Sequence, residues 1–166
     1  MKGRVQNYMK KIVGLLFVIL LLAGCGSKEE AKPYFNSNMS LPFEIVKYEE
    51  KIAPVYGNLV PHIAYAKTQG QLESLMSRFQ VDNVDIDMDK YMALSVVVNS
   101  DGCGIVADKV YNRKGDLSLQ LIKPKGDNCT VDAVPHTFVI KVEQGDYEGV
   151  QLYEGDILKS SMEIKE

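Results

Sequence analysis

The chain has 166 residues, of which 46% are hydrophobic and 25% are charged, and its formal net charge is −3. This composition suits one modest globular domain and excludes a disordered polyelectrolyte, a collagen-like repeat and a membrane protein with several spans. The charge is uneven: the first 24 residues hold four basic and no acidic side chains, so the remainder carries 15 basic against 22 acidic ones, a net charge of −7. Because phosphate binding needs clustered Lys and Arg, nucleic acid is not expected as a partner.

An apolar segment near the amino terminus follows a basic stretch that ends at Lys10 and Lys11. Residues 12–23 (IVGLLFVILLLA) contain no charge and would cover about 18 Å as a helix, against roughly 30 Å of bilayer hydrocarbon. The segment is too short for a transmembrane helix, and a basic flank before a short apolar core is typical of an export signal. The alternative, a buried core helix, would show a polar face, and this segment has none.

The apolar segment ends in Leu22-Ala23-Gly24-Cys25, which is an aliphatic residue, two small residues and a cysteine. These four positions resemble the lipobox of bacterial lipoproteins. The resemblance implies that the Cys25 thiol receives a diacylglyceryl group and that signal peptidase II cleaves between Gly24 and Cys25. It also implies that the new amino terminus can take a further acyl chain such as palmitate, and two or three chains together form a stable anchor.

We therefore expect residues 1–24 to be a lipoprotein signal peptide and Cys25 to begin a mature chain of 142 residues. The expected location is the outer face of the bacterial cytoplasmic membrane, or the outer membrane if the host has two membranes. The alternative is an ordinary secretory signal that leaves Cys25 as a free thiol. Residues 26–40 are small, charged or polar without a regular period, so residues 25–40 are predicted to be the lipidated cysteine and a flexible tether.

The clearest helix pattern lies between Gln69 and Phe79. Thr68 can cap this helix, and Gln71 completes a Thr-x-x-Gln capping box. The apolar positions on one face follow at i, i+3, i+4 and i+7, and they are Leu72, Leu75, Met76 and Phe79. The pattern predicts a single amphipathic helix that ends at Phe79 or Gln80.

Most of the remaining sequence is typical of antiparallel strands separated by turns at residues 112–116 and 124–128. The predicted strands begin with Phe43, Ile45 and Tyr48 and continue at residues 59–66, 91–99, 105–111, 117–121, 137–142 and 150–153. One amphipathic helix packed on a largely antiparallel β-sheet is an α+β domain. We expect this domain over residues 41–158, followed by a tail at residues 159–166.

Four features follow one another in this region: a Thr-x-x-Gln-Leu helix, Val84-Asp85-Ile86-Asp87 before a hydrophobic strand, a Gly-x-Gly hairpin start, and a late Pro-His-Thr-Phe-Val-Ile strand. In this order, residues 60–143 resemble the carboxy-terminal domain of the protease complex subunit PrcB. Where that family has a Thr-Gly-Gly-Tyr turn, this chain has Asp101-Gly102-Cys103-Gly104. Where it has a Ser-Pro-aromatic sequence, this chain has Val134-Pro135-His136. The resemblance implies a β-rich accessory or binding module without catalytic residues of its own.

Two cysteines, Cys103 and Cys129, remain once Cys25 is lipidated, and an even number of cysteines suits an oxidising compartment. Both lie beside predicted turns, 26 positions apart. A structural disulfide between them would contribute about 3 kcal/mol on the chain-entropy model. Two free thiols and a redox site are the alternatives.

Four closely spaced aspartates raise the question of calcium binding, and they are Asp82, Asp85, Asp87 and Asp89. An EF loop counted from Asp85 would have Lys90 where glycine belongs and Val96 where the bidentate glutamate belongs. We expect instead that the last three aspartates share one solvated face of a strand. A weak calcium site stays open as the alternative.

The two histidines, His62 and His136, both follow prolines and are 74 positions apart, without the short spacing of zinc ligands. They are expected to be strand-edge histidines. The sequence has no Gly-x-Ser-x-Gly elbow, no glycine-rich phosphate loop and no carboxylate pair in an apolar context. We therefore expect neither an enzyme nor a cofactor, although a deep pocket that joins either histidine to carboxylates would favour an enzyme.

The leading hypothesis is a lipid-tethered, non-catalytic domain that binds another protein or a wall component outside the cytoplasm. The alternative is a protease-accessory or protease-inhibitor-like module. In that case the exposed loops at residues 101–104, 112–116 and 124–128 would enter the cleft of a partner, since loops commonly carry function.

Overall fold

The computed structural model describes residues 40–53, 57, 59–82, 84–126 and 129–165. The chain divides into two units, Met1–Ala31 and Lys32–Glu166, and all described residues belong to the second. The expected signal peptide, the cleavage position between Gly24 and Cys25, and the expected tether up to residue 39 lie outside the described residues. Within the described ranges, no helix has the length and apolar character needed to cross a membrane.

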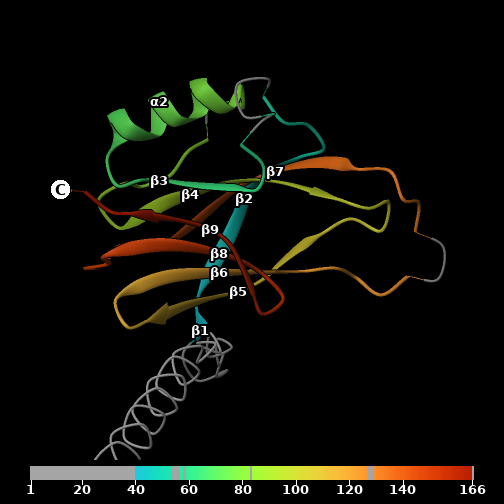
Figure 1. Ribbon diagram of the computed structural model, residues 1–166. Helices are drawn as coiled ribbons and strands as arrows, with labels where there is room; N and C mark the ends of the chain where they lie inside the picture. The colour runs from blue at the N-terminus through green and yellow to red at the C-terminus, as the bar shows by residue number, and fades with distance from the viewer. Residues whose placement is uncertain (1–39, 54–56, 58, 83, 127–128, 166) are drawn as a thin grey trace, which may run out of the picture. The chain divides into compact units, whose positions relative to one another are not determined.

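The folded unit consists of two stacked sheets and one short helix (Figure 1). One sheet has the strand order β2-β7-β4-β3 and the other has the order β1-β5-β6-β8-β9. The strands are β1 (Ser40–Leu41), β2 (Phe43–Glu49), β3 (His62–Ala66), β4 (Tyr91–Ser100), β5 (Val106–Arg113), β6 (Asp116–Ile122), β7 (Val134–Glu143), β8 (Gly149–Glu154) and β9 (Ile157–Glu163). All neighbouring strands are antiparallel except β6 and β8, which are parallel.

A mostly antiparallel β fold with one short helix is confirmed, but the strands form two sheets where a single sheet was expected. The reason is visible in β4, whose apolar residues do not alternate with polar ones because both of its faces are covered. On one face, Leu94 and Val96 belong to the core between the two sheets. On the other face, Ala93 and Val97 pack in a second core beneath the helix. The four-stranded sheet is therefore the middle layer of three.

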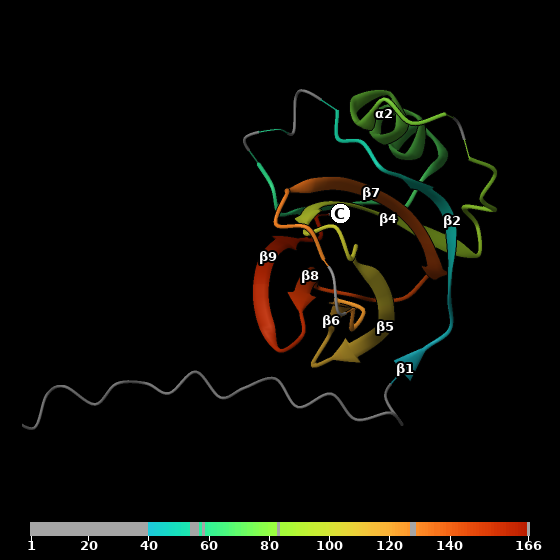
Figure 2. The same ribbon diagram turned by 90° about the vertical axis from the view of Figure 1, so that its right-hand side faces the viewer.

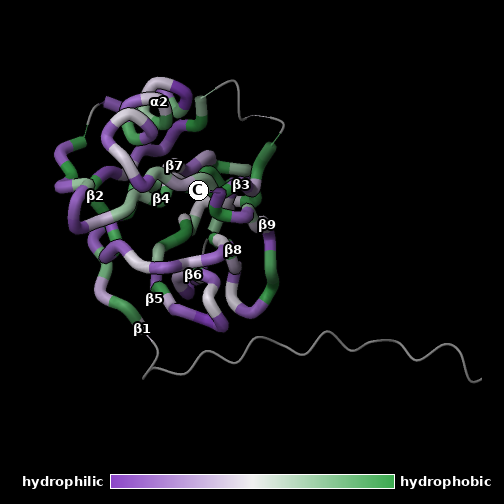
Figure 3. Tube along the Cα trace, turned by 90° about the vertical axis from the view of Figure 1, so that its left-hand side faces the viewer, coloured by the Kyte–Doolittle hydropathy of each residue, from purple (hydrophilic) through white to green (hydrophobic). Residues whose placement is uncertain are grey.

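Helix α2 (Gln69–Phe79) covers the outer face of the four-stranded sheet (Figure 1). The Thr68 hydroxyl oxygen accepts from the Gln71 backbone N–H at 3.3 Å, and the Gln71 side chain accepts from the Lys67 backbone N–H at 2.8 Å. The helix ends at Gln80, which adopts a left-handed conformation. The buried residues of the helix are the four that the spacing predicts: Leu72, Leu75, Met76 and Phe79. Figure 3 shows that hydrophobic and hydrophilic residues are interspersed along α2, whose hydrophobic residues are the buried ones.

The expected domain end at residue 158 is wrong, because β9 continues to Glu163 and pairs with β8 through Val150 and Met162. This strand lacks a regular apolar alternation, and both Ile157 and Leu158 are exposed. Its place in the sheet therefore depends on backbone pairing, which the side-chain pattern does not reveal. At the other end, Ser40 belongs to β1 and no longer to the tether.

The two sheets meet along both of their sides (Figure 2). On one side β3 contacts β9. On the other side the chain passes from one sheet to the other, since β1 pairs with β5 and β2, which follows at once, pairs with β7. Beyond this crossing, β2 and β5 lie in different sheets, and the space between them is where the candidate site lies.

Candidate binding cleft

A cleft of about 580 Å³ opens between β2 and the segment that leads into β5. Its walls come from β2, β7 and residues 101–106. Leu41 in β1 pairs with Val110 in β5, but β2 leaves β5 and pairs with β7. Ile45 in β2 and Val106 in β5 lie beyond this separation, and both line the cleft. The crossing of the chain between the sheets therefore positions the cleft.

A β-bulge in β2 directs two large side chains into the cleft. Ile45 pairs with Ile140 and Tyr48 pairs with Phe138, with a register shift between Ile45 and Lys47. In a regular strand, residues three positions apart point to opposite faces, but the extra residue of a bulge returns them to one face. Ile45 and Tyr48 both face the space between the sheets, and both line the cleft.

The mouth of the cleft is apolar and open to solvent. Ile45, Tyr48 and Val106 are 41%, 43% and 42% exposed, whereas Ile105 and Phe138, which also line the cleft, are buried. Single exposed apolar residues are common on protein surfaces, but here three of them gather at one concavity, which makes this cleft the candidate site.

His136 lies in the wall of the cleft and is 2% exposed. Its Nδ1 is 2.8 Å from the hydroxyl oxygen of Tyr48, which in turn donates to Oε1 of Glu50 at 3.4 Å. The Tyr48 ring stacks on the imidazole, with centroids 5.9 Å apart, and lies 5.1 Å from the ring of Phe138. The other imidazole nitrogen, Nε2, is buried and has no hydrogen-bond partner among the described residues.

The electrostatic setting keeps this imidazole neutral. Burial lowers the pKa of His136, and the nearby Glu50 carboxylate only partly opposes that shift. Burial and the charge of Glu50 raise the pKa of Tyr48, so the phenol stays protonated. The hydroxyl oxygen of Tyr48 and Nδ1 of His136 share one hydrogen bond, and which of the two atoms donates depends on the imidazole tautomer. In either tautomer, Nε2 has no hydrogen-bond partner among the described residues.

One rim of the cleft is held by a disulfide. Cys103 and Cys129 are at bonding distance with their Cα atoms 4.8 Å apart, as the sequence predicts, so the loop that holds Cys103 is tied to the segment before β7. The backbone N–H of Gly102 also donates to the Thr130 carbonyl at 2.9 Å. A side chain at Gly102 would collide with Thr130, which explains the glycine at this close approach.

The two histidines lie on opposite faces of the four-stranded sheet. His62 pairs with Val97 and His136 pairs with Val98, the next residue of β4. Directly opposed residues share a face and successive residues alternate, so His62 faces helix α2 while His136 faces the other sheet. Shared zinc ligation is thereby excluded for this pair. His136 also departs from the expected strand-edge position, because β7 is an interior strand.

The expected strand for the aspartate cluster is wrong, since residues 84–90 form an irregular segment and a turn. Asp85, Asp87 and Asp89 nevertheless point outward, while Ile86 and Met88 between them are buried. The Asp87 carboxylate lies 2.7 Å from the Lys90 ammonium, which lowers the pKa of Asp87.

Within the described ranges, a single set of three potential metal ligands comes together, formed by Asp101, Cys103 and Cys129. Its two sulfur atoms are bonded to each other and are not available as thiolates. Asp82, Asp85, Asp87 and Asp89, for which a calcium site was the alternative, are not among the described residues that form such a set.

No protein-family model matches this sequence, and neither a curated protein nor a solved structure matches it. The lipobox at Cys25 and the resemblance to the PrcB carboxy-terminal domain therefore stay predictions. The cleft itself could not be predicted from the sequence, because Tyr48, Glu50 and Val106 belong to no recognisable motif. Tyr48 lies beside His136 only because of the bulge in β2.

Proposed function

We propose that this chain is an extracytoplasmic lipoprotein, anchored by lipid at Cys25 to the outer face of the bacterial cytoplasmic membrane. Its folded part is a non-catalytic domain that binds another protein. The lipobox supports the anchor, and the Cys103–Cys129 disulfide is consistent with an oxidising compartment.

The observation that carries the binding proposal is the open apolar mouth of the cleft. Ile45, Tyr48 and Val106 are held in contact with water by a β-bulge and a chain crossing, although covering their apolar surface would be favourable. A partner that inserts an apolar group between β2 and β5 would supply that cover. The disulfide keeps the opposite rim in place before the partner arrives, which reduces the ordering cost of binding.

The cleft does join His136 to carboxylates, which is the arrangement that would favour an enzyme. Three interactions weigh against that function. Nδ1 of His136 and the Glu50 carboxylate are both engaged by Tyr48, and Cys103 is bonded to Cys129. Among the described residues that line the cleft there is no serine, threonine or lysine to act as a nucleophile. A buried imidazole in an apolar wall is better suited to recognition.

Photo-crosslinking in intact cells tests the binding proposal. A benzophenone amino acid replaces Val106 in the mouth of the cleft or, as a matched control, Leu158 on β9, since these residues are 42% and 49% exposed. We expect discrete crosslinked products from position 106 and none of the same size from position 158. The same products from both positions, or none from position 106, would contradict binding at the cleft.

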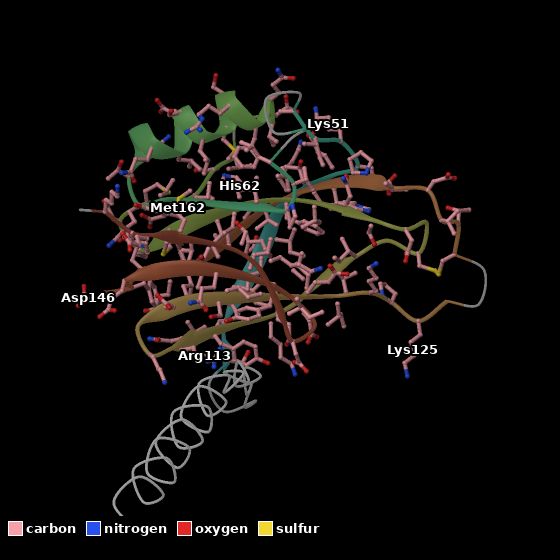
Figure 4. The ribbon with its side chains drawn as sticks, viewed as in Figure 1. Lys51, His62, Arg113, Lys125, Asp146 and Met162 are labelled. Carbon is pink, nitrogen blue, oxygen red and sulfur yellow. A yellow bond between two sulfur atoms is a disulfide. The ribbon has the colours of Figure 1, made fainter. Side chains whose placement is uncertain are left out.

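A second candidate function is the protease-accessory or inhibitor-like module, which the PrcB resemblance supports. The disulfide favours it, because it ties the loop at residues 101–104 to Cys129. The side chain of Lys125 points away from the disulfide (Figure 4). The loop at residues 112–116 lies elsewhere. It closes the end of the β5–β6 hairpin at which Arg113 pairs with Asp116, and Val106 pairs with Ile122 at the opposite end. A benzophenone at position 125 that captures an exported protease would support this function, and capture only from position 106 would reject it.

A further inference from the structure

We propose that residues 33–36, which precede β1, cover the outer face of the five-stranded sheet and rest on Tyr111 and Tyr153. This segment has the sequence Pro-Tyr-Phe-Asn and lies outside the described residues. It belongs to the predicted tether, so part of the tether is docked on its own domain. The docking does not depend on the proposed binding at the cleft.

Tyr111 and Tyr153 lie on the face of the five-stranded sheet that points away from the other sheet. Tyr111 follows Val110 in β5, and Tyr153 follows Leu152 in β8. Val110 and Leu152 belong to the core between the two sheets. Because successive residues of a strand point to opposite faces, both tyrosines point outward.

Both tyrosines are buried although no described helix or strand packs on that face. Tyr111 is 2% exposed and Tyr153 is 4% exposed. The four-stranded sheet lies on the opposite face, and α2 lies beyond it (Figure 2). A large aromatic ring on a bare sheet face keeps one side in contact with water, so these fractions require a further layer. The fractions are those of a single chain, and the layer therefore comes from the same chain.

Side chains of the sheet engage the Tyr153 hydroxyl, so the covering layer meets the ring itself. The hydroxyl oxygen accepts from Nη1 of Arg113 at 3.2 Å and donates to Oε1 of Gln151 at 2.9 Å. Nε2 of Gln151 in turn donates to Oδ2 of Asp116 at 2.6 Å. Aromatic side chains are well suited to cover such a ring, because aromatic pairs stabilise a contact beyond the area that they bury.

The segment before β1 is the part of the chain outside the described ranges that begins at this face. Ser40 pairs with Tyr111 itself. The other positions outside the described ranges adjoin residues that lie elsewhere: Ala53 and Val84 at the core beneath α2, Cys129 in the disulfide, and Lys165 beside β3.

The two aromatic residues of the tether have the reach and the chemistry that the face requires. Tyr34 and Phe35 are the only aromatic residues at positions 26–40. They precede Ser40 by six and five positions, a span of up to about 20 Å. Strand β8 is two strands away from β5, which is about 10 Å. Residues 36–38 (Asn-Ser-Asn) are types that form turns, so the chain can fold back over the face.

Docking shortens the free part of the tether, a consequence that rests on the proposed lipid anchor at Cys25. Residues 26–32 then remain between the anchor and the docked segment, and they span at most about 25 Å. Residues 26–39 together would span up to about 50 Å. The domain is therefore held closer to the membrane, while the cleft between β2 and β5 stays open.

Intramolecular photo-crosslinking tests the docking in the protein purified from cells. A benzophenone amino acid replaces Phe35 or, as a control in the same tether, Glu29, and mass spectrometry identifies the joined tryptic peptides. We expect position 35 to crosslink within one chain to the peptide that contains Tyr111 or to the one that contains Tyr153. Position 29 should give neither product.

Three results of this experiment would overturn the inference: no product from position 35, products with other parts of the domain, or the same products from position 29. Products found only in crosslinked dimers would also overturn it, because a second copy would then supply the cover. The measurement does not require lipid at Cys25 or a partner in the cleft. Its failure is therefore distinguishable from failure of the proposed function.

Nitration by tetranitromethane measures the cover independently. Replacing both Tyr34 and Phe35 with serine should make nitration of Tyr111 and Tyr153 at least about tenfold faster than in the wild type. Tyr48, which is 43% exposed, is the internal reference and should react at an unchanged rate.

The matched control replaces Lys28 and Lys32, two other tether residues, with serine and should leave all of these rates unchanged. Circular dichroism verifies that both variants are folded. Unchanged nitration in the Tyr34 and Phe35 variant, or an equal increase in the lysine variant, would contradict the docking.

Discussion

At the scale of single residues, Tyr48 organises the cleft because its hydroxyl contacts both Nδ1 of His136 and the Glu50 carboxylate. The centroids of its ring and the imidazole are 5.9 Å apart, and the Tyr48 side chain is 43% exposed. The pair is 88 positions apart in the chain, and it forms only because β2 and β7 are adjacent strands with a bulge between Ile45 and Lys47. Local sequence patterns give no information on such a contact.

Tyr48→Phe should lower the free energy of unfolding by about 1 kcal/mol, because it leaves both nitrogens of His136 without a protein partner. Urea denaturation followed by circular dichroism measures the change. Tyr91→Phe is the control, since the ring of Tyr91 lies 5.2 Å from the Lys141 ammonium and its hydroxyl has no hydrogen bond to any described residue. A loss of stability as large in the control would contradict the role given to the Tyr48 hydroxyl.

The burial of His136 predicts a pH dependence of stability. Burial lowers its pKa in the folded state, whereas an unfolded histidine titrates near 6.5. Between those two values the unfolded chain binds more protons, so the free energy of unfolding should fall as the pH falls from about 6.5 toward the lower folded pKa. His62, whose pKa burial also lowers, contributes in the same direction.

Urea denaturation at several pH values between about 7.5 and 5 checks this prediction. The carboxylates with lowered pKa, among them Glu49 and Glu154, titrate below this window and do not interfere. The slope with pH should be shallower for His136→Gln than for the wild type. An identical slope in the variant would show that His136 is not held neutral by the fold.

At the scale of elements, α2 was predictable from the sequence because everything that defines it is local. The capping residue Thr68, the partner Gln71 and the four buried positions lie within twelve consecutive residues. The structure adds one detail, since the Gln71 side chain accepts from the N–H of Lys67 rather than from that of Thr68. Strand β9 shows the opposite case, because its pairing with β8 comes without an apolar pattern.

Thr68→Ala should lower the free energy of unfolding by about 1 kcal/mol, the usual cost of losing an N-cap side chain. Thr68→Ser keeps the hydroxyl and should remain within about 0.3 kcal/mol of the wild type. Chemical denaturation of the two variants distinguishes the cap from other effects of the substitution. Equal losses in both variants would mean that the hydroxyl does not cap α2.

The disulfide links an element to the candidate site, because Cys103 lies in the rim of the cleft. Replacing both Cys103 and Cys129 with serine should lower the free energy of unfolding by about 3 kcal/mol, on the chain-entropy model for a separation of 26 positions. Thermal denaturation measures this loss, and adding a reductant to the wild type should reproduce it. A reductant with no effect on either the melting temperature or thiol titration would contradict a bridge in the mature protein.

At the scale of the whole molecule, the sequence predicted an antiparallel β fold with one helix but not its layering. The uninterrupted apolar pattern of β4 predicts a strand that is buried on both faces, but it does not indicate which elements cover each face. The answer, a helix on the face of Val97 and a second sheet on the face of Val98, separates the two histidines and places His136 alone at the cleft.

The same layering divides the loops that the inhibitor-like hypothesis groups together. The loop at residues 101–104 and the Cys129 segment share one end through their disulfide, whereas the turn at residues 112–116 closes the far end of the β5–β6 hairpin. The three loops therefore cannot enter one partner cleft together. This arrangement favours the cleft between β2 and β5 as the binding site.

Mass spectrometry of the protein isolated from native membranes tests the central claim, an exported and lipid-anchored domain, most directly. We expect a mature chain that begins at Cys25, carries a diacylglyceryl group on that cysteine, and has a mass two hydrogens lower than the reduced form because Cys103 and Cys129 are joined. A chain that retains Met1 would contradict this proposal, and so would a chain that is cleaved at another position and has three free thiols.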